Sequence, residues 1–144
     1  MKSKLLVESP SEHTWAVIFE TGEEAMAGLL AFAGQESIGA AHFTAIGAFS
    51  KAVLGYFDWE SKEYRRIPMD EQVEVVTLMG DIALEQGKPK VHAHAVLAKR
   101  GGVTVGGHLL EGHVRPTLEV VLSKSPKSLE RSFDPESGIA LIKI

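Results

Sequence analysis

Four of the six histidines lie between Val91 and His113, in the segment VHAHAVLAKRGGVTVGGHLLEGH. Residues two apart on a β-strand point to the same face, so His92 and His94 are expected to project together. Imidazoles at this spacing are typical of a site for a divalent metal ion. Zinc is the first candidate, although ligand type alone does not distinguish it from nickel, copper or iron.

The expected third ligand is His108, on the strand that follows the KRGG loop. If Ala98 paired with Val103 around a four-residue loop, Gly107 would stand opposite His94. In that register His108 would face away from the pair, because neighbouring residues of a strand alternate between faces. The hairpin needs a register shift of one residue to bring the third histidine to the first two.

Two local features could supply that shift. A five-residue loop over 99–103 would do so, and so would a β-bulge at Gly106-Gly107. Either would place His94 opposite His108, whereas His113, at odd spacing, is expected outside the cluster. The alternative is that these are half-buried histidines of a sheet, hydrogen-bonded to backbone or carboxylate groups.

Two carboxylates lie near the histidines in sequence. Glu111 and Glu119 could each orient a ligand histidine or act as a general acid or base on a metal-bound water. Strand alternation equally allows Glu119 to face solvent. Three protein ligands leave an open coordination position, which is typical of catalytic zinc, so a metal-dependent hydrolase or lyase is one hypothesis. The sequence has no P-loop and no nucleophile-elbow motif. Their absence favours a binding protein, and an enzyme stays open as the alternative.

Length and composition limit the number of domains and the classes of site and partner. The 144 residues are expected to form one domain over 1–144, with 44% hydrophobic and 24% charged residues. There is no cysteine, which excludes disulfides and thiolate metal sites. The net charge of −4 opposes nucleic-acid binding through phosphates. The N-terminal apolar run, 5–7, is too short for a signal peptide, so a cytoplasmic protein without a membrane partner is expected.

The predicted elements begin with a strand over 12–20, rich in β-branched and aromatic residues. Thr21 is predicted to cap a helix that carries acidic residues in its first turn and ends near Gly34 or Gly39.

Strands follow from residue 40 onward. We expect a bent strand pair or bulges over 40–59, an edge strand over 62–69, two strands broken near Gly80 within 71–90, a hairpin of 91–98 with 103–112, and strands over 117–124 and 138–144. The pattern predicts an α+β domain, a mostly antiparallel sheet with one principal helix packed on a face.

The segment GKPKVHAHAVLAKRGGVTVGGHLLEGHVRPTLEVVL, with the preceding EVVTLMGDIAL, strongly resembles the PPC domain, named for plants and prokaryotes. The resemblance extends from WAVIFETGEEAMAGLLAFA to LEVVL. It implies an α+β fold with a central antiparallel sheet, assembly into homotrimers, and metal binding through His92, His94 and His108.

Plant members of this family place the domain after AT-hooks in DNA-associated proteins. The nearest match here, KRGGV, lacks the second arginine and the proline of an AT-hook. We therefore expect a freestanding domain of the prokaryotic type, a homotrimeric metal-binding module with a regulatory or ligand-binding role and room for a protein partner. A metal-dependent enzyme, or a DNA-binding protein by analogy with the plant relatives, are the alternatives.

Overall fold

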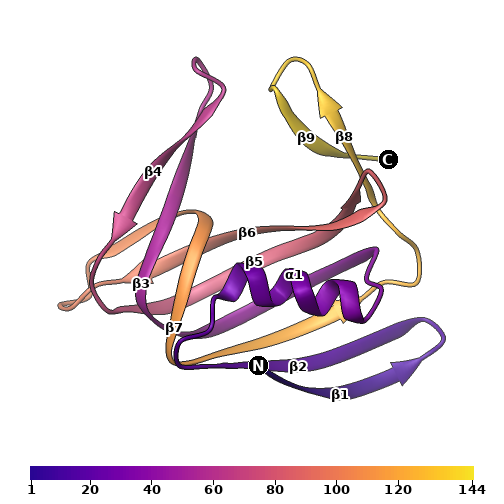
Figure 1. Cartoon of the computed structure of the whole chain (residues 1–144), viewed down its shortest axis with the longest axis horizontal. Coiled ribbons are helices and arrows are strands. Elements are labelled where there is room, and N and C mark those ends of the chain that lie inside the picture. The colour runs from indigo at the N-terminus through magenta and orange to yellow at the C-terminus, as the bar shows by residue number, and fades with distance from the viewer.

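The computed structural model describes residues 1–144. It has one helix and nine strands, coloured along the chain in Figure 1. The elements are β1 (Lys2–Ser9), β2 (Glu12–Glu20), α1 (Ala25–Gln35), β3 (Ala40–Asp58), β4 (Glu63–Met69), β5 (Val73–Glu85), β6 (Lys88–Ala98), β7 (Thr104–Lys124), β8 (Glu130–Asp134) and β9 (Ile139–Lys143). The α+β class with a mostly antiparallel sheet is confirmed. No helix is long and apolar enough to cross a membrane.

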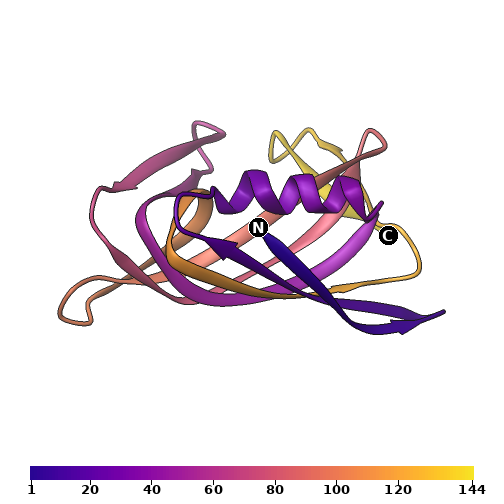
Figure 2. The same ribbon diagram turned by 60° about the horizontal axis from the view of Figure 1, so that its bottom comes forward.

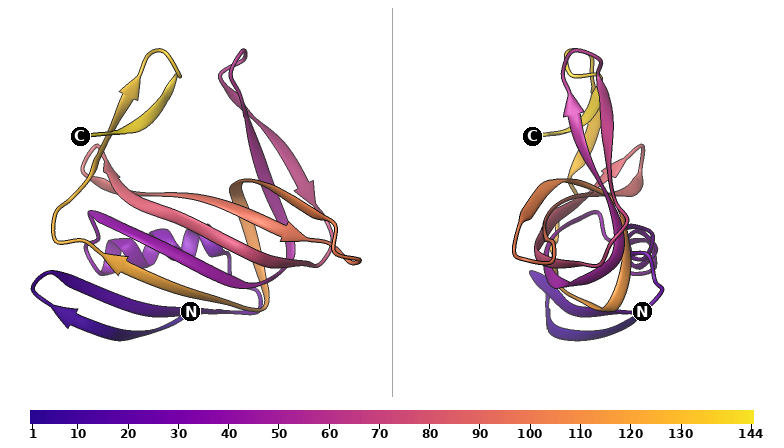
Figure 3. Two further views of the ribbon diagram at one scale, coloured as in Figure 1. Left: turned by 180° about the vertical axis from the view of Figure 1, so that it is seen from behind. Right: turned by 90° about the vertical axis from the view of Figure 1, so that its left-hand side faces the viewer.

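The sheet closes on itself around its four central strands. β3 pairs with β5, β5 with β6, β6 with β7, and β7 returns to β3, all antiparallel. The closure is visible as a ring in the right-hand view of Figure 3. β2 and β1 extend the sheet beyond β7, while β8 joins β5 through a short parallel pairing and forms a hairpin with β9. Closure removes most free edges, which are otherwise open to pairing with other chains.

Helix α1 covers one face of the sheet (Figure 2). Its buried side chains include Leu29 and Phe32, and the Phe32 ring meets that of Trp15 edge to face at 5.8 Å. On β2 the side chains of Trp15, Val17 and Phe19 are buried, and those of Ala16 and Ile18 between them are only partly buried. The core therefore lies inside the closed sheet and under the helix, and alternate residues point to an outer face that the helix does not cover.

The helix begins later than the sequence pattern suggested. Glu24, rather than Thr21, is the N-cap, and its carboxylate accepts hydrogen bonds from the backbone N–H groups of Met26 and Ala27. The same carboxylate accepts a third bond, 2.9 Å long, from the N–H of Gly112 on β7. Glu24 thus ties the start of the helix to the sheet, a tertiary contact that helix-capping preferences do not reveal.

The sequence pattern predicted a strand break near Gly80, and this prediction is wrong. Strand β5 runs through Gly80 without interruption. A Cβ at this position would lie 2.3 Å from the carbonyl oxygen of His92 and 2.5 Å from Cζ of Phe43. The glycine is required by close packing. The reversal after β5 is a two-residue turn at Gln86 and Gly87, whose φ angles of 52° and 75° suit a type I′ hairpin.

Two long strands replace shorter predicted ones. β3 is a single bent strand whose register shifts between Ala45 and Gly47, in agreement with the predicted bulge. β7 joins the predicted strands over 103–112 and 117–124 into one, which pairs with β6, β3 and β2 in turn. The hairpin of β3 with β4 and the hairpin of β8 with β9 project on the same side, above β6 in Figure 1.

Candidate metal site

The β6–β7 hairpin sets the histidines side by side. Ala98 pairs with Thr104, so the loop spans the five residues 99–103, and His94 stands directly opposite His108. The five-residue loop is therefore the alternative that the structure adopts. The predicted register is confirmed.

The Gly106-Gly107 pair does not bulge on this side, because both residues continue the regular pairing with β6. A Cβ at Gly107 would lie 2.8 Å from the carbonyl oxygen of Gly55. This glycine lets β7 pass closely over β3 where it leaves β6, and His108 is the next residue along β7.

The three imidazoles converge on one region of the outer face. The Nε2 atoms of His92 and His94 are 3.2 Å apart, and one ring nitrogen from each of His92, His94 and His108 lies within 4.8 Å of the others. Ring centroids are separated by 4.9, 5.1 and 5.3 Å. Two nitrogens bound to a tetrahedral zinc ion at the usual bond length stand about 3.3 Å apart, so the first pair already has a suitable spacing.

A carboxylate orients His92 from the neighbouring strand. Asp81 on β5 pairs with His92, and its Oδ2 lies 3.5 Å from Nδ1 of the imidazole. With Nδ1 turned to the carboxylate, Nε2 faces His94. This is the arrangement by which an outer carboxylate holds a metal-ligating histidine in orientation.

Asp81 is itself held by Arg131 of β8. The Nη2 group of Arg131 donates to Oδ1 of the carboxylate, and Nη1 donates to the backbone oxygen of Ala140 at 3.4 Å. The Arg131 side chain is only 8% exposed, whereas that of Asp81 is 33% exposed. The site thus depends on a chain segment well beyond the hairpin that carries the histidines.

Burial keeps two of the imidazoles neutral. Burial is the first cause that lowers the pKa of His108 to about 4, and repulsion from His92 and His94 when they are protonated, and from Arg131 and Lys90, contributes to the same shift. The pKa of His92 is also lowered, first by burial, although the nearby Asp81 carboxylate acts in the opposite direction. Neutral imidazole is the form that binds a metal ion, so these two side chains are ready to bind without losing a proton near neutral pH.

His108 has a further unusual property. Its Nδ1 is buried and has no hydrogen-bond partner. The ring of Tyr64, on β4, packs against the imidazole of His108, with 4.7 Å between the two ring centroids. A buried ring nitrogen without a partner is uncommon in proteins, and a bound ion or molecule would account for it.

The remaining candidates lie outside the histidine group. Glu111 forms an ion pair with Arg66 and is 4.0 Å from the imidazole of His113, and none of these belongs to the group. Glu119 is exposed on the outer face near the other end of β7, opposite Ile18 and Ile46. The solvent-facing interpretation is the correct one for Glu119, and His113 lies outside the cluster as expected.

Sequence reasoning missed Asp81 and Arg131. Asp81 had a usable signal, because a two-residue turn at 86–87 places it directly opposite His92. Arg131 had none, since β8 pairs with β5 through only two residue pairs.

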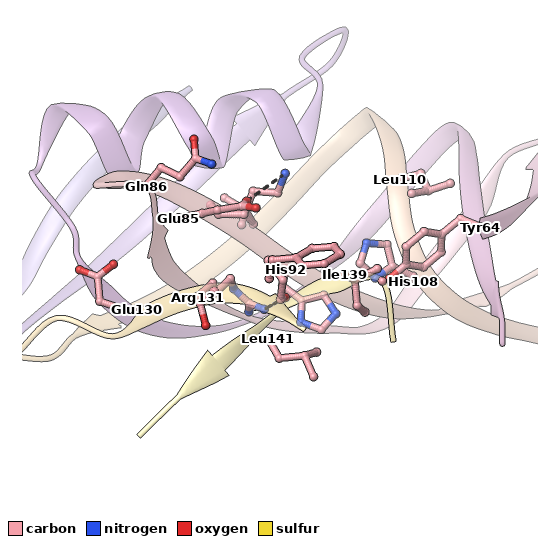
Figure 4. A pocket seen from close by; sticks show the side chains of 16 residues that line it. Tyr64, Glu85, Gln86, His92, His108, Leu110, Glu130, Arg131, Ile139 and Leu141 are labelled. Carbon is pink, nitrogen blue, oxygen red and sulfur yellow. Dashed lines mark hydrogen bonds and ion pairs between the residues drawn. The ribbon is translucent and has the colours of Figure 1, made fainter. Parts of the chain in front are cut away.

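A cavity of about 960 Å³ opens beside the histidines, between β6, Tyr64 and the β8–β9 hairpin. In Figure 4, Tyr64 and His108 stand at one end of this cavity and Glu130 at the other. The volume is within the range of small-molecule pockets. The histidine site therefore borders a space large enough for an organic ligand.

Fold and site together define a class: a closed antiparallel sheet covered by one helix, with three histidines on its outer face. Residues 7–126 match the Plants and Prokaryotes Conserved domain, abbreviated PCC or PPC. The chain belongs to this family, as its histidine segment suggested.

Solved structures agree with that assignment. A plant- and prokaryote-conserved protein from Pyrococcus horikoshii is 32% identical, with a TM-score of 0.86 over 99% of this chain and 95% of the other. A metal-containing protein from Archaeoglobus fulgidus is 31% identical, with a TM-score of 0.84 over 100% and 99% of the two chains. A protein from Ralstonia eutropha, whose name provisionally assigns it to DNA binding, is 29% identical, with a TM-score of 0.85 over 90% of each chain.

A curated relative is much longer. The bifunctional protein GlmU of Synechococcus sp. strain JA-2-3B'a(2-13) is 32% identical over 97 residues. The match takes in 66% of this chain but only 14% of that protein. The similarity therefore concerns one part of the relative.

Proposed function

We propose that this protein is a homotrimeric metal-binding module with a regulatory or ligand-binding role, in which His92, His94 and His108 hold one divalent ion, zinc being the first candidate. The observation that carries the proposal is the convergence of three ring nitrogens within 4.8 Å on paired strands. Strands hold side chains more rigidly than loops do, so little ordering is needed when an ion binds.

The donor set fits such an ion. The 3.2 Å separation of the Nε2 atoms suits tetrahedral zinc, the Asp81 carboxylate stands behind His92, and the buried Nδ1 of His108 lacks a partner. When bound, a zinc ion on three histidines would supply a Lewis acid with one open coordination position. The metal-containing relative from Archaeoglobus fulgidus supports this role from outside the chain.

The trimer is supported by the outer face beside the site. Met79, next to His94 across the sheet, is 55% exposed, and Val121 and Ile46 on the adjoining strands are 49% and 61% exposed. Clustered exposed apolar side chains are typical of protein interfaces. Light scattering is expected to give three times the 15.6 kDa chain mass, and a monomer at micromolar concentration would contradict the trimer.

The metal is tested by elemental analysis of untagged protein incubated with zinc and then desalted. Wild type should carry one ion per chain and His94→Ala should carry none, because a site with two histidines retains metal poorly. His42→Ala is the matched control: this exposed histidine lies on the same face, opposite Asp81, outside the group. Wild-type protein that remains metal-free would contradict the proposal.

Two other functions have less support. A hydrolase or lyase needs an acid–base group at the open position, but Glu111 is paired with Arg66 and Glu119 lies far along β7. DNA binding is suggested by a relative's name, whereas this chain carries a net charge of −4. Titration of duplex DNA at low salt would decide the latter, because phosphate contacts are strongest there.

A further inference from the structure

Three residues that line the cavity beside the histidines carry buried polar side-chain atoms without a hydrogen-bond partner. The buried side-chain atoms without a hydrogen-bond partner are Nδ1 of His108, Nε of Arg131 and Oγ of Ser132, and all three residues line this one cavity. Leaving a buried polar group unpaired costs stability, and most such groups in proteins are paired. Nδ1 of His108 already supports the proposed ion, so Nε of Arg131 and Oγ of Ser132 are the two donors left for another polar group.

Arg131 supplies a hydrogen-bond donor near the histidine end. Its side chain is only 8% exposed, Nη2 is paired with Asp81 and Nη1 with the Ala140 carbonyl, so the Nε–H group is the donor that remains for a ligand. The acidic side chain of Glu130 lies at the opposite end in Figure 4, and Glu85 is 3.6 Å from Lys90, which it neutralises. A divalent ion on neutral histidines would add further positive charge.

The rest of the wall is apolar. Leu110 and Val91 line one side, and Ile139, Leu141 and Phe133 of the β8–β9 hairpin line the other. Leu141 is 40% exposed and Phe133 is 65% exposed, so the fold does not bury them. Apolar surface of this kind around a few polar groups is typical of sites for small organic ligands.

We infer that this cavity binds a small organic carboxylate with an apolar body, its carboxylate directed toward Arg131 and Ser132 beside the histidines and its body resting on the β8–β9 hairpin. The inference deepens the proposed function, because the ligand would lie against the metal site. The contacts with Arg131 and Ser132 do not require the ion. The ligand should therefore still bind to protein stripped of metal, but with lower affinity.

The test uses 3-methylbutanoate as the probe, titrated into ¹⁵N-labelled protein in zinc-loaded and EDTA-treated forms. Nuclear magnetic resonance follows the Nε–H signal of Arg131, assigned by its loss in Arg131→Lys. The signal should shift with saturation. Acetate, which lacks most of the apolar body, and the neutral 3-methylbutanamide should each bind at least about tenfold more weakly.

Variants separate recognition from structural roles. Arg131→Lys lacks the Nε–H signal, so its binding is followed by the backbone amide signal of Ser132 and should be about tenfold weaker, whereas Arg100→Lys, in the loop after β6, should leave binding unchanged. Ser132→Ala should weaken binding without lowering the unfolding temperature, because it removes a hydroxyl that has no partner in the free protein. A purely structural Ser132 would show the reverse.

The outcomes are distinguishable. No shift at millimolar probe in either form overturns the inference, and so does equal binding of the amide or of acetate. If zinc content is stoichiometric and the probe does not bind, this inference fails and the metal site stands. If the stripped protein binds the probe but no zinc is taken up, the inference stands and the metal site fails.

Discussion

Replacement of Asp81 by asparagine tests whether the carboxylate behind His92 contributes to metal binding. The variant removes the negative charge 3.5 Å from Nδ1 and leaves the positive charge of Arg131 without its partner. Both changes disfavour a cation on His92. Loss of an outer carboxylate typically weakens metal affinity by about 10- to 100-fold. Because Asp81 is shared with Arg131, we expect the lower end, about tenfold, or about 1.4 kcal/mol.

The assay is competition for zinc between stripped protein and a chromophoric chelator, with the fold checked by circular dichroism. Glu111→Gln is the matched control, since it removes the same charge from a carboxylate that is paired with Arg66 outside the histidine group. The control should bind zinc as wild type does. Unchanged affinity in Asp81→Asn would refute the reasoning, and equal weakening in both variants would reduce it to an effect of net charge.

Three further predictions concern stability. Glu24→Ala should destabilise the protein by about 1 to 3 kcal/mol in urea unfolding, because the helix cap and the bond to the Gly112 N–H are lost together; a loss below 0.5 kcal/mol would argue against that double role. Gly80→Ala should cost about 1 to 3 kcal/mol and lower the unfolding temperature, since the added methyl meets the Phe43 ring and the His92 carbonyl; an unchanged temperature would show that the site relaxes freely. In metal-free protein, the lowered pKa of His108 means that the unfolded chain binds a proton more readily than the folded protein does. The free energy of unfolding should therefore fall by about 1 to 3 kcal/mol as the pH drops from 6.5 to about 4. In urea unfolding at several pH values, His108→Asn should show a smaller decline, and parallel profiles for the two proteins would contradict this prediction.

The sequence was most informative where spacing alone determines geometry. Strand β2 has the predicted bounds of 12–20, because alternation and β-branched residues act locally. The hairpin register of His94 and His108 followed from parity and a loop of either four or five residues. The helix start did not, because the bond from Gly112 to the capping carboxylate joins residues far apart in the chain.

The grouping of the three histidines was predictable from the sequence, and the surroundings of the group were not. Three histidines can be found from the period of a strand, but the closure of β3, β5, β6 and β7 depends on long bent strands that the sequence pattern divided into shorter ones. Gly80 illustrates the ambiguity, because a glycine inside an apolar run is equally consistent with a break and with close packing. Local patterns cannot choose between these without knowing where Phe43 lies.

The two parts of the site come from different parts of the chain, and this separates their roles. The three histidines and Asp81 lie within residues 7–126, the region that defines the family. Arg131 and the apolar wall of the cavity lie in the β8–β9 hairpin, outside that region. The proposed ion site therefore lies on paired strands within residues 7–126, whereas the proposed ligand would lie against a short hairpin that has only two residue pairs to β5. Changes at the apolar hairpin residues Ile139 and Leu141 would alter the contacts of the proposed ligand and leave the pair of Arg131 with Asp81 in place, so we expect ligand choice to vary within the family more readily than metal binding.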